Sequence, residues 1–262
     1  MMSEKLVSIL VPTYNRKWLL PRAINSLVTQ SYKNIEIIVV NDGGEDVENI
    51  VKSFKDKRIK YFQIENRGLA GARNVAINNS NGDFICLLDD DDIYLKYAIE
   101  FRMHMINQLH ASIVYTRSLR DIWEKRGEQY VSVAKNLYWD SPFDKDLILV
   151  QNIAPCCNIL FSRKAWEKTG NYQFDETLTS TEDHDMWIGL SRYSSFHNLE
   201  IVDTECSYRT DATQMTGARD FSKNWITVFK KWRNTAKNLE WVVNAQNNVL
   251  QNAGINPADH GL

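Results

Sequence analysis

The chain has 262 residues, of which 44% are hydrophobic and 24% are charged, so it suits one globular domain or one domain with a substantial appendage. Its 31 Lys and Arg residues nearly balance 33 Asp and Glu residues, and the net charge of −2 argues against a general attraction to nucleic acid. No stretch approaches about 18 consecutive apolar residues, and the N-terminus lacks a long apolar region, so we expect neither a transmembrane segment nor a signal peptide.

The cysteine pattern does not predict a metal site. Cys156 and Cys157 are adjacent, whereas Cys86 and Cys206 stand alone, so the chain contains no C-x-x-C pair of the kind that binds zinc. We interpret all four as buried thiols in a reducing cytoplasm.

Strand and helix patterns alternate through the first half of the chain. Short apolar runs that end in turn residues predict buried strands at residues 6–12, 35–42, 58–65, 82–88 and 111–116. Helical spacing of apolar residues, or polar sequence between strands, predicts helices at residues 16–30, 46–54, 69–80 and 94–109. This alternation through about residue 118 is typical of βαβ units, so we expect an α/β fold whose mostly parallel sheet is flanked by helices.

The second half has a less regular pattern. We expect residues 120–150 to form an excursion and residues 157–170 to form a strand followed by a short helix. A helix should begin near Thr181, which can serve as its cap, and a helical pattern runs from Phe221 to about Leu250. The tail at residues 252–262 is expected to be frayed.

Three of the expected strands end in polar residues: "PTYNR", "NDGG" and "DDDD". Ligands bind at the carboxyl ends of the strands in parallel sheets, so these residues predict a cleft. Side chains two apart in extended chain point the same way, which places Asp89 and Asp91 on one side and Asp90 and Asp92 on the other. Such carboxylates suit a hard divalent cation that carries a phosphorylated substrate, or they form a solvated acidic loop before the next helix.

Four motifs, "VPTYNR", "VVNDGG", "NRGLAGARNVAINNSNGDFICLLDDDD" and "STEDHDMW", resemble in order and spacing those of family 2 glycosyltransferases with the GT-A fold. The resemblance covers about residues 5–210. It implies an enzyme that transfers a sugar from a nucleotide-diphosphate donor with inversion at the anomeric carbon, using Mn²⁺ or Mg²⁺. It also implies a GT-A domain at residues 1–215, with a nucleotide-binding half (about 1–118) and an acceptor half (about 119–215), followed by a C-terminal helical extension at 216–262.

The same resemblance assigns the metal ligands. It implies that Asp91 binds the metal and that Asp89 contacts the ribose or reaches the metal through water. Asp90 could share these roles, because four consecutive aspartates leave the register open by one residue. Asp211 stands where the family often has a metal-binding His, and it could bind the cation or be a loop residue.

Further positions match the nucleotide-binding motifs of the family. Asp42 is expected to accept a hydrogen bond from the base, although Asp before two glycines is also common turn chemistry. The resemblance places Pro12, Thr13 and Tyr14 against the base, and Arg209 near the diphosphate. Arg67 and Arg73 could each meet the nucleotide or the aspartates; for Arg73 a buried pair with an Asp is the other interpretation.

The "STEDHDMW" motif implies the acceptor side of the site. Asp183 matches the general base that takes a proton from the acceptor hydroxyl, while Glu182 and His184 would contact the acceptor. The alternative is that acidic residues simply favour the first turn of a helix.

The resemblance implies a donor that is most often a UDP-sugar and an acceptor that is a carbohydrate or lipid-linked saccharide, in cell-surface polysaccharide synthesis. We expect a cytoplasmic location, with possible contact to the inner face of the membrane. The C-terminal aromatic face, flanked by lysines, could lie on lipid, join a second copy of the chain or pack on the domain. A sugar-phosphate nucleotidyltransferase and a non-catalytic GT-A-like scaffold are the alternative functions.

Overall fold

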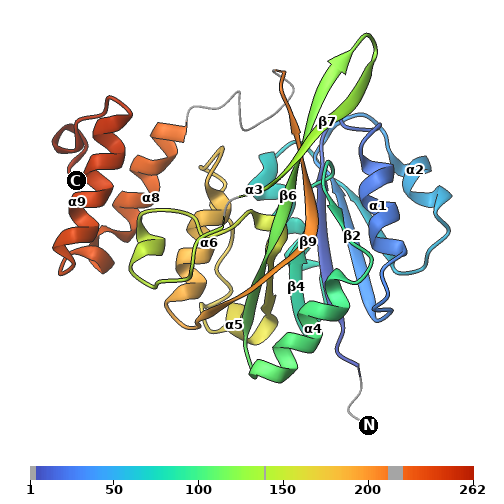
Figure 1. Ribbon diagram of the computed structural model, residues 1–262, viewed down its shortest axis with the longest axis horizontal. Coiled ribbons are helices and arrows are strands. Elements are labelled where there is room, and N and C mark those ends of the chain that lie inside the picture. Colours follow the sequence, from blue (N-terminus) through green and yellow to red (C-terminus); the bar gives the residue numbers. More distant parts are fainter. Residues whose placement is uncertain (1–3, 139, 212–220) are drawn as a thin grey trace.

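The computed structural model describes residues 4–138, 140–211 and 221–262, and Figure 1 shows a central twisted sheet with helices on both faces. Its strands are β1 (Val7–Thr13), β2 (Ile35–Asn41), β3 (Ile59–Gln63), β4 (Phe84–Leu87), β5 (Ile93–Tyr94), β6 (Ile113–Arg126), β7 (Gln129–Leu137), β8 (Ile159–Ser162) and β9 (Phe196–Arg209). Its helices are α1 (Leu20–Val28), α2 (Glu48–Ser53), α3 (Gly68–Asn78), α4 (Ala98–Leu109), α5 (Arg163–Glu167), α6 (Glu182–Ser191), α8 (Phe221–Ala236) and α9 (Glu240–Asn252), with 3₁₀ turns at Leu147–Leu149, Cys156–Asn158 and Pro257–His260.

The sheet has the strand order β3-β2-β1-β4-β8-β6-β9-β5, and β7 pairs with β6. The expected parallel arrangement holds for β3, β2, β1 and β4. The other half is mixed, because β8 runs antiparallel to both β4 and β6, β9 runs parallel to β6, and β5 runs antiparallel to β9.

Two apolar clusters fill the spaces between the sheet and its helices. On one face, α1, α2 and α4 pack on alternate residues of the strands, such as Ile9 and Val39. On the other face, α3, α5, α6, α8 and α9 cover the intervening residues, such as Leu10 and Ile38. Both faces of β1 and β2 are therefore buried, which explains their continuous apolar sequences.

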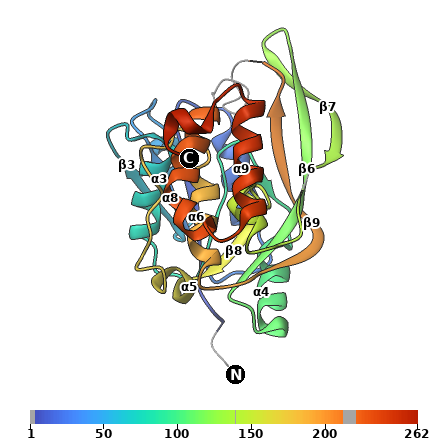
Figure 2. The same ribbon diagram turned by 90° about the vertical axis from the view of Figure 1, so that its left-hand side faces the viewer.

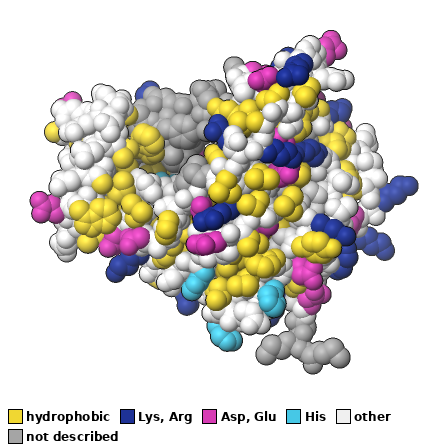
Figure 3. Space-filling model, in the orientation of Figure 1, with side chains coloured by type: hydrophobic (Ala, Val, Ile, Leu, Met, Phe, Trp, Pro, Cys, Tyr) yellow, Lys and Arg dark blue, Asp and Glu magenta, His cyan; other side chains and the backbone are white. Residues whose placement is uncertain are grey.

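The strands and helices predicted for the first half of the chain are present. The excursion expected at residues 120–150 instead extends the sheet, because β6 continues to Arg126 and turns into β7. This β6–β7 hairpin projects from the body of the protein at the top of Figure 1. Figure 3 shows the face of the protein seen in Figure 1, on which acidic and basic side chains are interspersed without a large patch of one sign.

Three expectations for the second half are wrong in detail. Thr181 precedes α6 but does not cap it: its φ of 65° is left-handed, and its buried Oγ1 has no hydrogen-bond partner among the described residues. The helical pattern from Phe221 is split into α8 and α9 by a turn before Glu240. The tail forms a 3₁₀ turn whose Pro257 is buried, so it packs on the domain.

The two C-terminal helices share the core of the domain. Val228, Phe229 and Ala236 of α8 and Val242 and Leu250 of α9 are fully buried in the cluster that also holds residues of α3 and α6. Figure 2, in which α8 and α9 face the viewer, shows them packed in front of α6. None of the helices in the described segments is long and apolar enough to cross a membrane.

Candidate active site

The carboxyl ends of β1, β2 and β4 meet at one cavity of about 550 Å³, which we call the β1 cavity. The Asp42 N–H donates to the Thr13 carbonyl at 2.9 Å, and the Thr13 hydroxyl donates to Asp90 Oδ2 at 2.7 Å. The residues that line the cavity and match the sequence predictions are Pro12, Thr13, Tyr14, Asp42, Asp89, Asp90 and Arg209. The three polar strand ends therefore come together as their positions predicted.

Arginine side chains hold the aspartate cluster together. Arg16 Nη1 lies 2.9 Å from Asp90 Oδ1 and 3.0 Å from Asp91 Oδ2. Arg209 Nη2 lies 3.1 Å from the same Asp91 oxygen. These contacts offset the repulsion between neighbouring carboxylates and show how so acidic a loop is stable at the end of a buried strand.

Asp89 is the most accessible of the four aspartates, with a side chain that is 27% exposed. Arg73 Nη2 lies 2.8 Å from Asp89 Oδ1. Burial alone would raise the pKa of Asp89, but Arg73 and Arg16 more than offset it and hold that pKa below its usual value. Asp89 is therefore an anion at neutral pH. Burial raises the pKa of Asp90 instead, despite its contact with Arg16.

Asp42 directly follows β2 and lines the β1 cavity. Its Oδ1 accepts a hydrogen bond from the Arg67 backbone N–H at 2.8 Å, and burial raises its pKa. The Arg67 side chain turns away to Glu176, with Nη2 and Oε1 2.5 Å apart. Tyr14 lines the same cavity and is 49% exposed, so its ring is available to a ligand.

Arg209 and Asp211 lie at and just after the end of β9, and they differ in their surroundings. Arg209 is buried against Asp91, as described above. The Asp211 carboxylate accepts a hydrogen bond from the Tyr130 hydroxyl of β7 at 2.5 Å. Tyr130 lines the β1 cavity and stacks on Trp18 with ring centroids 5.0 Å apart. Asp211 is thus joined to the wall of the cavity through Tyr130.

A second cavity of about 590 Å³, which we call the α6 cavity, is lined by Asp183 in the first turn of α6. Asp183 Oδ2 accepts a hydrogen bond from Asn152 Nδ2 at 3.1 Å, and Oδ1 accepts one from the His184 N–H at 2.7 Å. These two bonds fix the direction of the carboxylate at the cavity wall.

The residues on either side of Asp183 are more deeply buried. Glu182 Oε1 lies 2.5 Å from Arg73 Nη1, and burial raises the pKa of Glu182. His184 Nε2 lies 2.7 Å from the Ile148 carbonyl oxygen, and burial lowers the pKa of His184, so its ring is neutral. Arg73, itself 1% exposed, bridges Glu182 to Asp89. For Arg73 the sequence left open nucleotide binding or a buried pair with an Asp, and the structure contains the buried pair.

The β1 and α6 cavities adjoin, because Asp89 and Leu69 line both. One cavity therefore ends in a cluster of carboxylates and arginines, and the next begins there and contains an oriented carboxylate, Asp183. This arrangement can hold a ligand that spans the two spaces, with its central part at Asp89.

A third cavity, of about 150 Å³, is lined by Asp89, Asp91 and Asp92 and has room for a hydrated ion. Carboxylate oxygens are the ligands that Mn²⁺ and Mg²⁺ prefer, so the donor set fits a divalent cation. A cation on Asp91 would replace contacts that Arg16 and Arg209 make in this structure.

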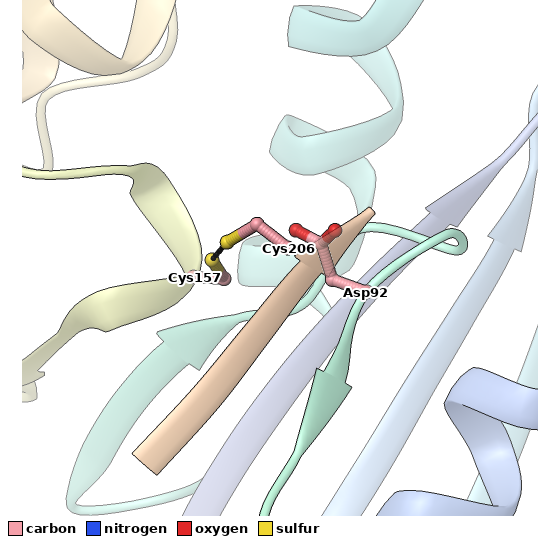
Figure 4. Close-up of side chains that lie close together, drawn as sticks. All are labelled: Asp92, Cys157 and Cys206. Atoms are coloured by element: carbon pink, nitrogen blue, oxygen red, sulfur yellow. Dashed lines mark hydrogen bonds between the residues drawn. The ribbon is translucent and has the colours of Figure 1, made fainter. Parts of the chain in front are cut away.

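Asp92 lies beside two thiols, those of Cys157 and Cys206 (Figure 4), and all three side chains line the third cavity. Cys157 Sγ and Cys206 Sγ lie 3.2 Å apart, and all three side chains are buried. The hydrogen bond with Cys206 and burial both raise the pKa of Cys157, so the thiol stays protonated at neutral pH. Because metals bind the thiolate, this environment agrees with the interpretation of the cysteines as packed thiols.

We expect the native protein to react slowly with Ellman's reagent, since all four cysteines are free and buried. Absorbance at the thionitrobenzoate band should show four thiols per chain only after unfolding in guanidinium. Rapid reaction of a thiol in the native protein, or fewer than four after unfolding, would contradict this arrangement.

Several residues of the site carried no clear signal in the sequence. Asn152 holds Asp183, and Trp225 and Val249 line the α6 cavity, yet they come from distant segments that follow no motif. Tyr130 and Trp18 line the β1 cavity and belong to the unpredicted hairpin and to the start of the first helical stretch.

Comparison with known proteins identifies the family. Residues 8–170 match the model described as glycosyl transferase family 2. An uncharacterised glycosyltransferase of Rickettsia typhi is 33% identical over 232 residues, which are 86% of this chain and 72% of the relative. The Campylobacter jejuni GalNAc(5)-diNAcBac-PP-undecaprenol β-1,3-glucosyltransferase is 30% identical over 240 residues, 89% of this chain and 74% of the relative. The chain belongs to glycosyltransferase family 2 and is a glycosyltransferase.

Solved structures show the same fold. TarS of S. aureus, residues 1–349, in complex with UDP-GlcNAc, superposes with a TM-score of 0.65 at 21% identity, over 86% of this chain and 64% of that one. The mannosyltransferase PcManGT of Pyrobaculum calidifontis, in complex with GDP-Man and Mn²⁺, superposes with a TM-score of 0.64 at 15% identity. The match covers 89% of this chain and 65% of that one. The fold of the chain is therefore GT-A, as its motifs predicted.

Proposed function

We propose that this enzyme transfers a sugar from a nucleoside-diphosphate donor to an acceptor hydroxyl with inversion of the anomeric carbon, and that the donor is a UDP-sugar. The observation that carries the proposal is the junction of two cavities at Asp89, with nucleotide-compatible residues in one and an oriented carboxylate in the other. Structures of the same fold hold UDP-GlcNAc or GDP-Man, which supports a donor of this class.

The nucleotide would lie in the β1 cavity. Asp42 would accept a hydrogen bond from the base, and Tyr14 would cover the face of the base. Arg16 and Arg209, which both contact Asp91, would face the diphosphate, whose negative charge they complement. Arg67 would contribute through its backbone, since its side chain lies on Glu176.

Asp89 and Asp91 would hold Mn²⁺ or Mg²⁺, which supplies positive charge to a diphosphate leaving group. Asp183, in the α6 cavity, would accept the proton of the acceptor hydroxyl as its oxygen attacks the anomeric carbon. Inversion requires one such base on the side of the sugar opposite the leaving group. The position of Asp183 in the neighbouring cavity, beyond Asp89, supports this assignment.

We further propose a role in the assembly of a cell-surface polysaccharide. The C. jejuni relative is named for an undecaprenol-linked saccharide acceptor, and it aligns over 89% of this chain. An acceptor saccharide carried on a lipid would place its terminal sugar in the α6 cavity.

A thermal-shift screen of UDP, GDP, TDP and CMP with Mn²⁺ tests the donor class. A nucleotide at 100 times its Kd should stabilise the protein by about 2.7 kcal/mol, which raises the Tm of a domain of this size by about 5–10 °C. We expect UDP to give the largest shift and EDTA to remove most of it. No shift with any nucleotide would contradict the proposal.

A further inference from the structure

The C-terminal helices build one wall of the α6 cavity. Trp225 of α8 and Val249 of α9 line the same space as Asp183. Asn224, next to Trp225, is buried, and its Nδ2 donates to Ser180 Oγ at 2.8 Å. The start of α8 is therefore fixed beside the residues that lead into α6.

A second set of contacts fixes α8 along the body of α6. Trp232 Nε1 donates to Asp185 Oδ1 at 2.8 Å, and Lys231 Nζ lies 2.9 Å from Asp185 Oδ2. Asp185 is fully buried, and Phe229 of α8 is fully buried in the shared core. Trp225 is thus held on a rigid support at a set place relative to Asp183.

The lining of this cavity combines an aromatic ring with hydrogen-bonding groups. Gln151, Asn152, Ser180 and Thr181 add amide and hydroxyl groups around Trp225. The face of an indole is electron-rich, so it attracts the C–H groups on the apolar face of a pyranose ring. Amides and hydroxyls suit the hydroxyl groups at the edge of such a ring.

The charges of the described residues that line the cavity disfavour an anion. Among the described residues that line it, Asp89, Glu182 and Asp183 are acidic, and Arg73 is the one Lys or Arg. Arg73 is already bonded to Glu182 and Asp89. A phosphate or carboxylate on the acceptor would meet the Asp183 carboxylate here, while Arg73 is already paired and a cation on Asp89 would be paired with the diphosphate of the donor.

We propose that Trp225 is the platform on which the ring of an uncharged acceptor sugar lies, with a hydroxyl directed toward Asp183. This inference rests on the proposed function and deepens it, because it assigns the acceptor class and a specificity residue. The C-terminal helices are then part of the acceptor site, and a group that carries a phosphate is not the part that enters the cavity.

Saturation-transfer NMR with matched probes tests the acceptor class. The probes are the methyl glycosides of glucose, galactose and N-acetylglucosamine and the 6-phosphates of the same three sugars, added to the full chain saturated with UDP and Mn²⁺. We expect transfer to the ring protons of at least one methyl glycoside and at least about tenfold weaker binding of its 6-phosphate.

Variants of two tryptophans test the platform. Trp225→Ala should weaken binding of the methyl glycoside about tenfold, the factor that 1.4 kcal/mol represents. Trp225→Phe keeps an aromatic ring, so its affinity for the methyl glycoside should fall by less. Trp241 of α9, which is 50% exposed and does not line the cavity, provides the matched control, and Trp241→Ala should bind as the native protein does. Both alanine variants should keep the native affinity for UDP, and Trp241→Ala should keep the native Tm. Trp225 packs partly against the core, so Trp225→Ala should have a lower Tm and is assayed at a temperature at which circular dichroism shows it folded.

Three outcomes would overturn the inference while UDP binds normally. They are equal binding of a glycoside and its 6-phosphate, unchanged binding in Trp225→Ala, and no binding of any methyl glycoside. If Trp225→Ala fails to fold, Trp225→Leu, which also removes the ring, takes its place, and unchanged binding of the methyl glycoside in that variant would overturn the inference. Failure of the native protein to bind any nucleotide would instead contradict the proposed function.

Discussion

Replacing Asp183 with Asn is expected to lower kcat for sugar transfer by about 100- to 10,000-fold, the usual contribution of a general base. The amide is nearly the same size: its oxygen can still accept from the His184 N–H, and its NH2 group can donate to Asn152 once the Asn152 amide turns over, so the fold should be retained. It cannot accept a proton at neutral pH. Coupled assay of UDP release in the presence of acceptor measures the loss.

The affinity for the nucleotide should not change, since Asp183 lines the α6 cavity and not the β1 cavity. Asp46→Asn is the matched control, because Asp46 is an exposed carboxylate that likewise accepts a hydrogen bond from a backbone N–H at the start of a helix, α2, on the opposite face of the sheet. It should transfer sugar at the native rate. Native-like kcat in Asp183→Asn would mean that another group acts as the base.

Replacing Asp91 with Asn is expected to remove the dependence of UDP affinity on Mn²⁺. Loss of a residue that only orients a metal ligand typically weakens metal binding by about 10–100-fold. Loss of a ligand itself should therefore weaken Mn²⁺ binding by at least about 100-fold. Isothermal titration of UDP with Mn²⁺ and with EDTA should give equal, weak affinities for the variant and a large difference for the native protein.

Asp90→Asn resolves the register of the aspartate run. Asp90 bonds the Thr13 hydroxyl and Arg16, and it lines the β1 cavity but not the small one. We therefore expect its variant to keep most of the Mn²⁺ dependence. The opposite result, with Asp90→Asn insensitive to Mn²⁺ and Asp91→Asn native-like, would move the metal ligand by one residue.

The sequence predicted the strands and helices of residues 1–118 well, because burial there leaves a continuous apolar pattern. Both faces of β1 are covered, so every residue from Val7 to Val11 is apolar apart from Ser8. Most of β7 is exposed on both faces, and β9 mixes exposed and buried residues, so neither shows a regular pattern. Their positions depend on pairing with β6, which a local pattern does not reveal.

The site was predictable where its residues end strands. Asp42 and Asp89 follow β2 and β4, and topology alone brings them together. The α6 cavity was less predictable, because Asn152 and Trp225, which line it together with Asp183, lie 31 residues before and 42 residues after Asp183 in the sequence. Of the arginines that neutralise the aspartates, Arg16 follows β1, a strand that the sequence predicted. Arg209 ends β9, a strand that the sequence did not predict.

A crystal structure with UDP and Mn²⁺ is the most direct test of the central claim, that aspartates at the end of β4 hold a cation which in turn holds a diphosphate. We predict an anomalous manganese peak within about 2.5 Å of an Asp91 oxygen, a typical oxygen-to-metal distance, with the diphosphate on its other side and the base beside Asp42. A nucleotide bound outside the β1 cavity, or manganese located away from Asp89 and Asp91, would contradict it.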